Sequence, residues 1–214
     1  MIVMLGRVTR RAFIERSAMF VSALALSPRW SVLAPIRVRI GIATPASMPR
    51  DQQLGLELGL DEAKHAATLF GGTIVDVPFA APERIDGAVT AVIGGGDEST
   101  TLAWIRQAAA SNTIYMNVGC AADRLRQQDC SRAAFHIVPS DAMARDARGA
   151  AKASSPKVRA EAWDASLKRF GADTLNQRFS ARFHEPMTSG AWSAWFAVKA
   201  IWESALRLKS ADAQ

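Results

Sequence analysis

The residues best suited to bind a small molecule lie between positions 94 and 101. Three glycines at 94–96 follow an apolar run rich in β-branched residues, which predicts a buried strand that ends in a tight turn. Asp97 is typical of a helix N-cap, and the hydroxyl residues at 99–101 fall in the first turn of the helix it would begin. Free backbone amides and hydroxyls at the carboxyl end of a strand are typical of ligand sites in α/β sheets. The alternative is a simple strand–helix turn without a ligand.

Catalytic residues are not predicted. His65, His136 and His184 are scattered over a predicted helix, strand and turn, and each is expected to be structural or solvated. The sequence has no dinucleotide fingerprint, phosphate-binding loop, nucleophile elbow or zinc-protease motif. We therefore predict that the protein is not an enzyme and has no cofactor and no metal.

The two cysteines of the chain, Cys120 and Cys130, are separated by a polar segment. In an oxidising compartment we expect them to form a disulfide, worth about 2–3 kcal/mol for so short a loop. The alternative is two unrelated buried thiols. Redox and zinc chemistry are weaker interpretations, because neither a CxxC motif nor a histidine at metal-ligand spacing accompanies these cysteines.

Residues 1–34 have the pattern of an export signal. The TRRAFI sequence at 9–14 resembles a twin-arginine motif, and the apolar run at 17–26 is far shorter than the ~20 residues of a membrane-spanning helix. Small or aliphatic residues at 32–34 predict cleavage after Ala34, by either the twin-arginine or the general secretion route, and a periplasmic location. A buried N-terminal helix fits poorly, because arginines precede a run without amphipathic spacing.

Charge gives no sign of a nucleic-acid partner. The formal net charge is +6, but residues 1–34 carry five arginines and one acid, so the remainder is close to +2. That remainder has charges of mixed sign and no basic stripe interleaved with aromatic residues.

Strands and helices alternate in the first half of the mature chain, which predicts a doubly wound, mostly parallel α/β sheet. The expected strands are 36–43, 73–79, 89–93, 113–118 and 134–138. A helix is expected at 50–70, with an apolar stripe ending at Phe70, and its Gly55 and Gly59 are expected to let it lie close to a sheet. The turns after the first, third and fourth strands, at 44–47, 94–101 and 119–122, should then meet at one edge of the sheet.

The second half changes in composition after Met143. Residues 144–157 are expected to hold a helix end and a linker, and 158–163 another strand. A helix over 165–183 is expected to be interrupted at Gly171. The final helix, 191–208, places Trp195 and Trp202 on one apolar face, which favours a core role for both over a ligand cage.

Three segments together resemble the type I periplasmic solute-binding proteins of the leucine/isoleucine/valine-binding kind, which serve ABC importers. These segments are GLELGLDEAKHAATLFGG at 55–72, AVIGGGDESTTLAWIRQAAASNTIYMNVGC at 91–120, and the C-terminal run RFSARFHEPMTSGAWSAWFAVKAIWESALR. The resemblance covers most of the mature chain and rests on general sequence patterns, not on an invariant motif. It implies a flavodoxin-like strand order and an exported amino-acid-binding component of an importer. A subgroup associated with PQQ-dependent alcohol oxidation is the most similar in style.

The resemblance also implies which residues hold the ligand. Family members bind a ligand's carboxylate and ammonium groups with the loops after strands three and four. Asp123 stands where a hydroxyl is common, which puts part of this site in doubt. Asp97 and Glu98 favour a zwitterion or a cationic amine over a bare anion. The ligand-binding residues expected here are Gly95, Gly96, Ser99, Thr100, Gly119, Cys120 and Ala121.

The largest departure from the family is length. We assign 35–148 to the first lobe, 149–157 to a linker that replaces most of the second, and 158–214 to elements that pack back on the first. A lobe needs roughly 100 residues to bury its own core, so hinge closure within one chain is not expected. A homodimer is one way to supply the second wall, and importer membrane subunits are the expected partners. The alternatives are a truncated interaction protein without a transport role, or an enzyme on a Rossmann-like sheet.

Overall fold

Five strands form a parallel sheet in the order β2-β1-β3-β4-β5. Each pairs in parallel register, for example Ile40 of β1 with Asp76 of β2 and Ala91 of β3. This order confirms the predicted doubly wound α/β fold with flavodoxin-like topology. The strands are β1 (Arg37–Ala43), β2 (Thr73–Phe79), β3 (Ala91–Gly94), β4 (Ile114–Asn117) and β5 (Ala134–His136).

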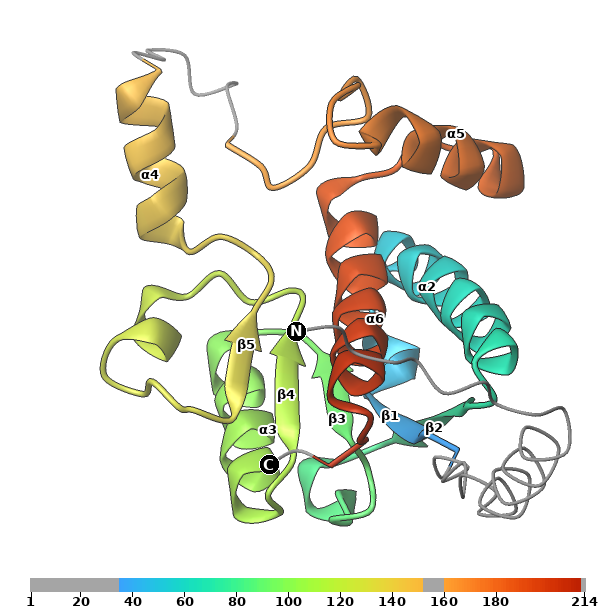
Figure 1. Ribbon diagram of the computed structural model, residues 1–214. Helices are drawn as coiled ribbons and strands as arrows, with labels where there is room; N and C mark the ends of the chain where they lie inside the picture. The colour runs from blue at the N-terminus through green and yellow to red at the C-terminus, as the bar shows by residue number, and fades with distance from the viewer. Residues whose placement is uncertain (1–34, 152–159, 213–214) are drawn as a thin grey trace, which may run out of the picture. The chain divides into compact units, whose positions relative to one another are not determined.

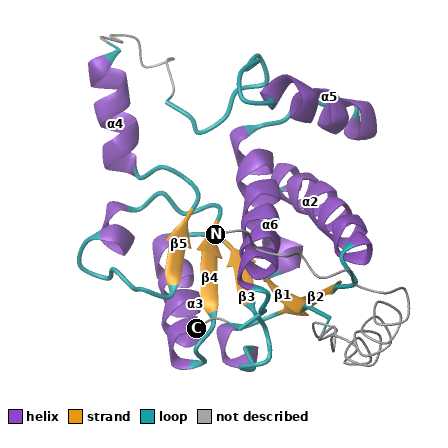
Figure 2. Cartoon of the chain, viewed as in Figure 1, coloured by secondary structure: helices purple, strands orange, loops and turns teal. Residues whose placement is uncertain are grey.

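The structure is a computed structural model that describes residues 35–151 and 160–212. The predicted export signal at 1–34 lies outside the described residues, as does most of the predicted linker. Figure 1 shows the described chain, and Figure 2 separates its helices from its strands.

Side chains alternate between the two faces of the sheet and so build two separate cores. On one face, Ile40, Ile93 and Met116 lie beneath α2 (Arg50–Leu69) and α6 (Ser189–Leu208). On the other face, Val92 and Tyr115 pack against α3 (Glu98–Ala110). The short turns η2 (Pro45–Ser47), η3 (Pro82–Arg84) and η4 (Asp123–Arg126) connect these elements.

Helices α2 and α6 lie side by side in Figure 1. Their close approach depends on Gly55, because a Cβ built there would lie 1.9 Å from the carbonyl oxygen of Ala191. A Cβ at Gly59 would lie 3.1 Å from the carbonyl oxygen of Trp195. The two glycines therefore allow α2 to lie close to α6, whereas the sequence predicted a close approach to the sheet. The expected apolar stripe of α2 is buried except at Phe70, which is 63% exposed beyond the end of the helix.

The segment after the linker differs from the prediction. No strand is formed by the described residues 160–163, where part of one was expected. The expected helix over 165–183 begins only at α5 (Ala172–Phe183), because Phe170 and Gly171 both have positive φ, 58° and 78°, and cannot continue a helix. Phe179 of α5 then packs with Leu58 of α2 and Trp195 of α6. Trp195 and Trp202 are both buried, which confirms their predicted core role.

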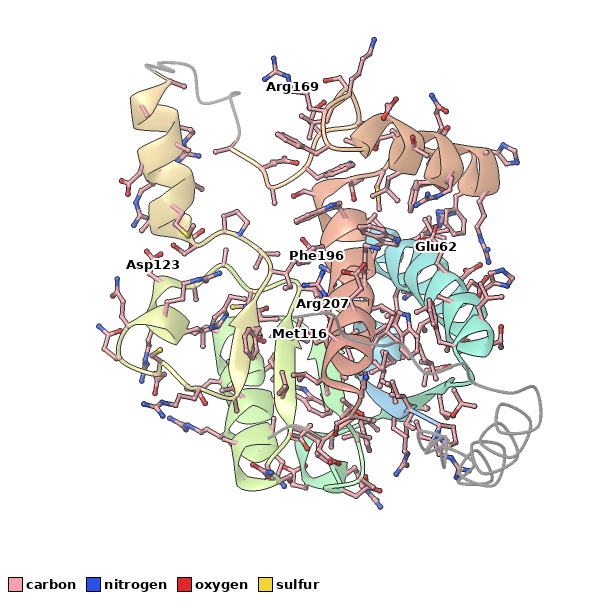
Figure 3. The ribbon with its side chains drawn as sticks, viewed as in Figure 1. Glu62, Met116, Asp123, Arg169, Phe196 and Arg207 are labelled. Atoms are coloured by element: carbon pink, nitrogen blue, oxygen red, sulfur yellow. The ribbon has the colours of Figure 1, made fainter. Side chains whose placement is uncertain are left out.

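Glu62 joins the three helices α2, α5 and α6 (Figure 3). Its carboxylate accepts a 2.9 Å hydrogen bond from Trp195 Nε1 and forms a 3.0 Å ion pair with Arg178 of α5. Helix α4 (Asp141–Ala150) has no comparable packing, since none of its residues is fully buried.

Candidate ligand-binding site at the carboxyl edge of the sheet

A cavity of about 390 Å³ opens at the carboxyl ends of β1, β3 and β4. The three turns that the sequence predicts to meet there do meet, and the first turn of α2 completes the wall. The lining residues are Ala43, Thr44, Ser47, Met48, Pro49, Gln52, Gly95, Gly96, Asp97, Thr100 and Gly119.

The glycines at this edge allow two turns to touch. A Cβ at Gly95 would lie 2.7 Å from both the Cα and the nitrogen of Gly119, so any side chain would force the turns after β3 and β4 apart. Gly96 has φ +143°, a conformation that L side chains rarely adopt. These glycines are therefore required by backbone packing, whatever the cavity holds.

Asp97 caps α3, as the sequence predicts. Its Oδ1 accepts hydrogen bonds from Thr100 N at 2.7 Å and from Ser99 Oγ at 2.8 Å, and its Oδ2 accepts from Thr100 Oγ1 at 3.1 Å. The bond from the Thr100 amide, helped by the two hydroxyls, lowers the pKa of Asp97. A negative charge therefore stands permanently at one side of the cavity.

The opposite side belongs to the start of α2. Pro49 occupies the N-cap and offers no side-chain acceptor to the helix amides. Gln52 is only 8% exposed, and its Nε2 donates to the Val118 carbonyl at 3.3 Å. Ser47 Oγ donates to the carbonyl of Thr44, a residue with φ +42°. The sequence analysis missed Gln52 as a site residue, because its position on the helix alone does not reveal the nearby turn at Gly119.

The structure divides the predicted ligand-binding residues into two groups. Gly95, Gly96, Thr100 and Gly119 line the cavity, whereas Ser99, Cys120 and Ala121 do not. The Ser99 hydroxyl is turned toward Asp97, and Cys120 packs in the core beneath α3. Ala121 lines a neighbouring cavity of about 310 Å³, which shares Gln52 and Gly119 with the first.

The predicted disulfide is absent from the structure, where both cysteines are free. Cys120 is buried in the core, while Cys130 is exposed after the η4 turn. The physical reason lies in the loop after β4, where Cys120 N donates to Asn117 Oδ1 at 2.9 Å. That bond fixes the backbone of Cys120, whose side chain is buried in the core, whereas Cys130 is exposed.

Asn117 holds the whole turn after β4. Its Oδ1 accepts from the amides of Gly119 and Cys120, and its Nδ2 donates to the Cys120 carbonyl at 2.7 Å. The same Nδ2 lies 3.0 Å from His136 Nδ1. Because Asn117 Nδ2 is a donor, Nδ1 of His136 must accept and the ring must be neutral. Burial, and next the charge of Arg126, lower the pKa of His136, in agreement with that assignment.

The part of the chain that the structure describes contains no group of three or more His, Cys, Asp or Glu side chains placed to hold a metal ion. It also contains no helix with the length and hydropathy needed to span a bilayer.

No protein-family model matches this sequence, and a search of curated proteins found no match. The solved structures do contain similar chains. An ABC transporter substrate-binding protein from Desulfitobacterium hafniense, in complex with Leu, aligns with a TM-score of 0.62 and 14% identity over 80% of this chain and 84% of that one. A branched-chain amino acid transporter substrate-binding protein from Streptococcus pneumoniae, in complex with isoleucine, aligns with a TM-score of 0.58 and 12% identity over 84% and 86%.

A periplasmic binding protein from Burkholderia mallei aligns with a TM-score of 0.58 and 12% identity, over 84% of this chain and 80% of that one. These neighbours define the class: the described residues form part of the type I periplasmic binding protein fold, as the sequence resemblance implies. At 12–14% identity the likeness concerns the fold. What this chain binds must be argued from its own site.

Proposed function

We propose that this protein is the exported substrate-binding component of an ABC-type importer, and that it binds a small zwitterionic solute such as an amino acid. The observation that carries the proposal is the cavity at the carboxyl edge of the sheet, walled by the turns after β1, β3 and β4. Neighbours with this fold were solved with Leu and with isoleucine, which supports a solute of that class.

The two sides of the cavity differ in charge, which favours a zwitterion. The start of α2 presents the positive end of the helix dipole, which suits the carboxylate of a solute, although Asp51 in the same turn already accepts from the amide of Gln52 at 2.9 Å. The α3 side is different, because Asp97 already caps that helix and adds a negative charge. The ammonium group of a zwitterionic solute would pair with the Asp97 carboxylate.

Export and the importer partner belong to this proposal. The twin-arginine-like segment and the expected cleavage after Ala34 support a periplasmic location. Neighbours that serve ABC transporters support importer membrane subunits as partners. Association with PQQ-dependent alcohol oxidation stays a prediction from the resemblance alone.

Calorimetric titration with leucine, isoleucine and the matching carboxylic acids without an amine tests the binding proposal. We expect an amino acid to bind and its deaminated analogue to bind more weakly. Asp97→Asn should reduce that preference while keeping the cap, because asparagine also caps helices well. Asp86→Asn is the matched control, since Asp86 lies outside the cavity lining and forms only a long ion pair, 3.9 Å, with Arg39.

Two results would contradict this proposal. One is the absence of binding by any amino acid. The other is equal binding by the amino acid and by its deaminated analogue, because the Asp97 carboxylate would then play no part.

The rival interpretation, a protein that binds only another protein, predicted exposed tryptophans on the last helix. Trp195 and Trp202 are instead buried, and Trp192 is half-buried between Trp163 and Phe196. The ring centroids of that stack are 5.5 and 5.1 Å apart. The cavity therefore supports solute binding more strongly than these tryptophans support a protein-binding role. A homodimer would be one means of closing the cavity.

A further inference from the structure

A second cavity lies beyond the edge strand β5 and shares no lining residue with the cavity proposed for the solute. It measures about 370 Å³. Its walls come from η4, from the end of β5, from α4, from residues 160–162 and from the first turn of α6. The side chains that matter for its chemistry are Arg126, His136, Met143, Glu161 and Trp192.

Arg126 gives this cavity a positive charge that is poorly compensated. Its Nη2 donates to a neutral group, the carbonyl of Val138. Its Nη1 is buried and has no hydrogen-bond partner among residues 35–151 and 160–212. Burial lowers the pKa of Arg126, and the carboxylate of Asp123 opposes that shift. A buried guanidinium N–H without an acceptor costs free energy that an incoming anion would recover.

Asp123 acts on Arg126 only from a distance, because its oxygens are already occupied. Oδ1 accepts from Ala142 N at 2.8 Å, and Oδ2 pairs with Arg145 Nη2 at 2.9 Å, which joins η4 to the start of α4 (Figure 3). His136 brings no charge, since its Nδ1 accepts from Asn117. Arg126 is thus the cation of the cavity, and exposed Glu161 is the one acid in its lining.

The stretch at 152–159, between α4 and Ala160, lies outside the described residues. Its sequence, KASSPKVR, contains three basic residues and no acid. The chain on either side of it contributes Met143 and Trp192 to the same lining, so an apolar surface stands beside the guanidinium. A cation next to an indole suits a ligand with one carboxylate and an apolar body.

We propose that this second cavity binds a small apolar or aromatic carboxylate, which pairs with Arg126 and lies against Trp192. Such a ligand satisfies the guanidinium and covers the apolar lining formed by Met143 and by the part of Trp192 that its stacking on Trp163 and Phe196 leaves open to the cavity. The cavity at Ala121 borders both this site and the solute cavity, but the two sites share no lining residue, so the proposal survives if the solute cavity proves to bind no amino acid.

Phenylacetate is a suitable probe, and the neutral phenylacetamide is its matched control. We expect calorimetry on the full chain to detect phenylacetate and to show phenylacetamide weaker by about tenfold or more. Arg126→Gln should weaken phenylacetate by a similar factor. Arg132→Gln should leave it unchanged, because Arg132 is exposed before β5 and does not line this cavity.

Amide hydrogen exchange on the unaltered protein locates the site even if Arg126→Gln fails to fold. Protection by phenylacetate should fall on residues 136–147 and on the start of α6. Three results would overturn the proposal: protection at residues 44–52 and 95–100 instead, equal binding of the amide, or no binding in the millimolar range.

Discussion

Helices α6 and α4 begin with the same kind of cap but differ in what they pack against. Each starts with a hydroxyl residue at the N-cap, Thr188 or Ser140, whose oxygen accepts from an amide of the first turn. Helix α6 then buries a continuous face against α2 and the sheet. Helix α4 buries no residue fully, although its sequence is more strongly amphipathic than that of α6. Amphipathic spacing therefore shows that a helix has a face to cover, whereas the partner for that face comes from the rest of the chain.

The largest expected effect tests the packed member of this pair. Trp202 is 5% exposed in the core beneath α6, so Trp202→Ala should lower the free energy of unfolding by about 3–5 kcal/mol. Met143 on α4 is 57% exposed, and Met143→Ala should change it by less than about 0.5 kcal/mol. Urea denaturation followed by circular dichroism measures both. Similar losses in the two variants would show that α4 is packed as firmly as α6.

Replacing a glycine by alanine should change the stability of the protein in opposite directions in α2, which packs against α6, and in α4. Gly55→Ala places a Cβ against the Ala191 carbonyl, and we expect a loss of about 2–3 kcal/mol as α2 and α6 separate. Gly149 of α4 has no atom within 4 Å of its Cβ position, so Gly149→Ala should stabilise by up to about 1 kcal/mol through helix propensity. Thermal denaturation of both variants gives the sign. A stabilised Gly55→Ala protein would mean that the helices are not in close contact.

The caps give a finer comparison. Thr188 Oγ1 accepts from Ala191 N at 3.1 Å and lies 2.7 Å from Asp51 Oδ2, so Thr188→Ala removes two bonds and should cost about 1–2 kcal/mol. Ser140→Ala removes one bond to the first turn of α4 and leaves the bond from Ala142 N to Asp123 Oδ1, so it should cost about 0.5–1 kcal/mol. Hydrogen exchange should show that the second loss is confined to α4. Global loss of protection in Ser140→Ala would contradict that distinction.

The smallest expected effect concerns acid. The pKa of His136 is lowered in the folded protein by burial and by Arg126, so the unfolded chain binds more protons below its ordinary value of 6.5. The contribution of His136 to the free energy of unfolding should therefore be fully present above pH 6.5 and be lost as the pH drops toward the folded-state pKa. His136→Gln should flatten this part of the pH profile, as measured by urea denaturation at several pH values. An unchanged slope would exclude His136 as the group responsible.

Much of this fold follows from local pattern. The alternation of apolar strands with amphipathic helices predicts the parallel sheet, and the spacing of Trp195 and Trp202 predicts their burial. The expected strand at 158–163 fails in its described part because a run of suitable residues cannot form a strand without a neighbour to pair with. The interruption expected at Gly171 is confirmed, but the helix expected before it does not form, and Phe170 with its φ of 58° lies outside any helix.

The candidate site was also predicted only in part from the sequence. The glycine turn and Asp97 carry local signals, a tight turn and a cap, so they could be located in the sequence. Gln52 could not, because its burial results from the approach of Gly119, which follows a different strand. Cys120 was misassigned for the same kind of reason: a spacing of ten residues does not show that Asn117 fixes the backbone of Cys120 or that the thiol is buried in the core beneath α3.

The place of α6 in the chain has a consequence for folding. The sheet face carrying Ile40 and Ile93 is closed by α6, residues 189–208, which leaves the ribosome after all five strands. Until that helix is made, the nascent chain exposes an apolar sheet surface that only distant residues can cover. A holding chaperone acting on the unfinished chain would find its binding surface there, and the arrival of α6 would release it.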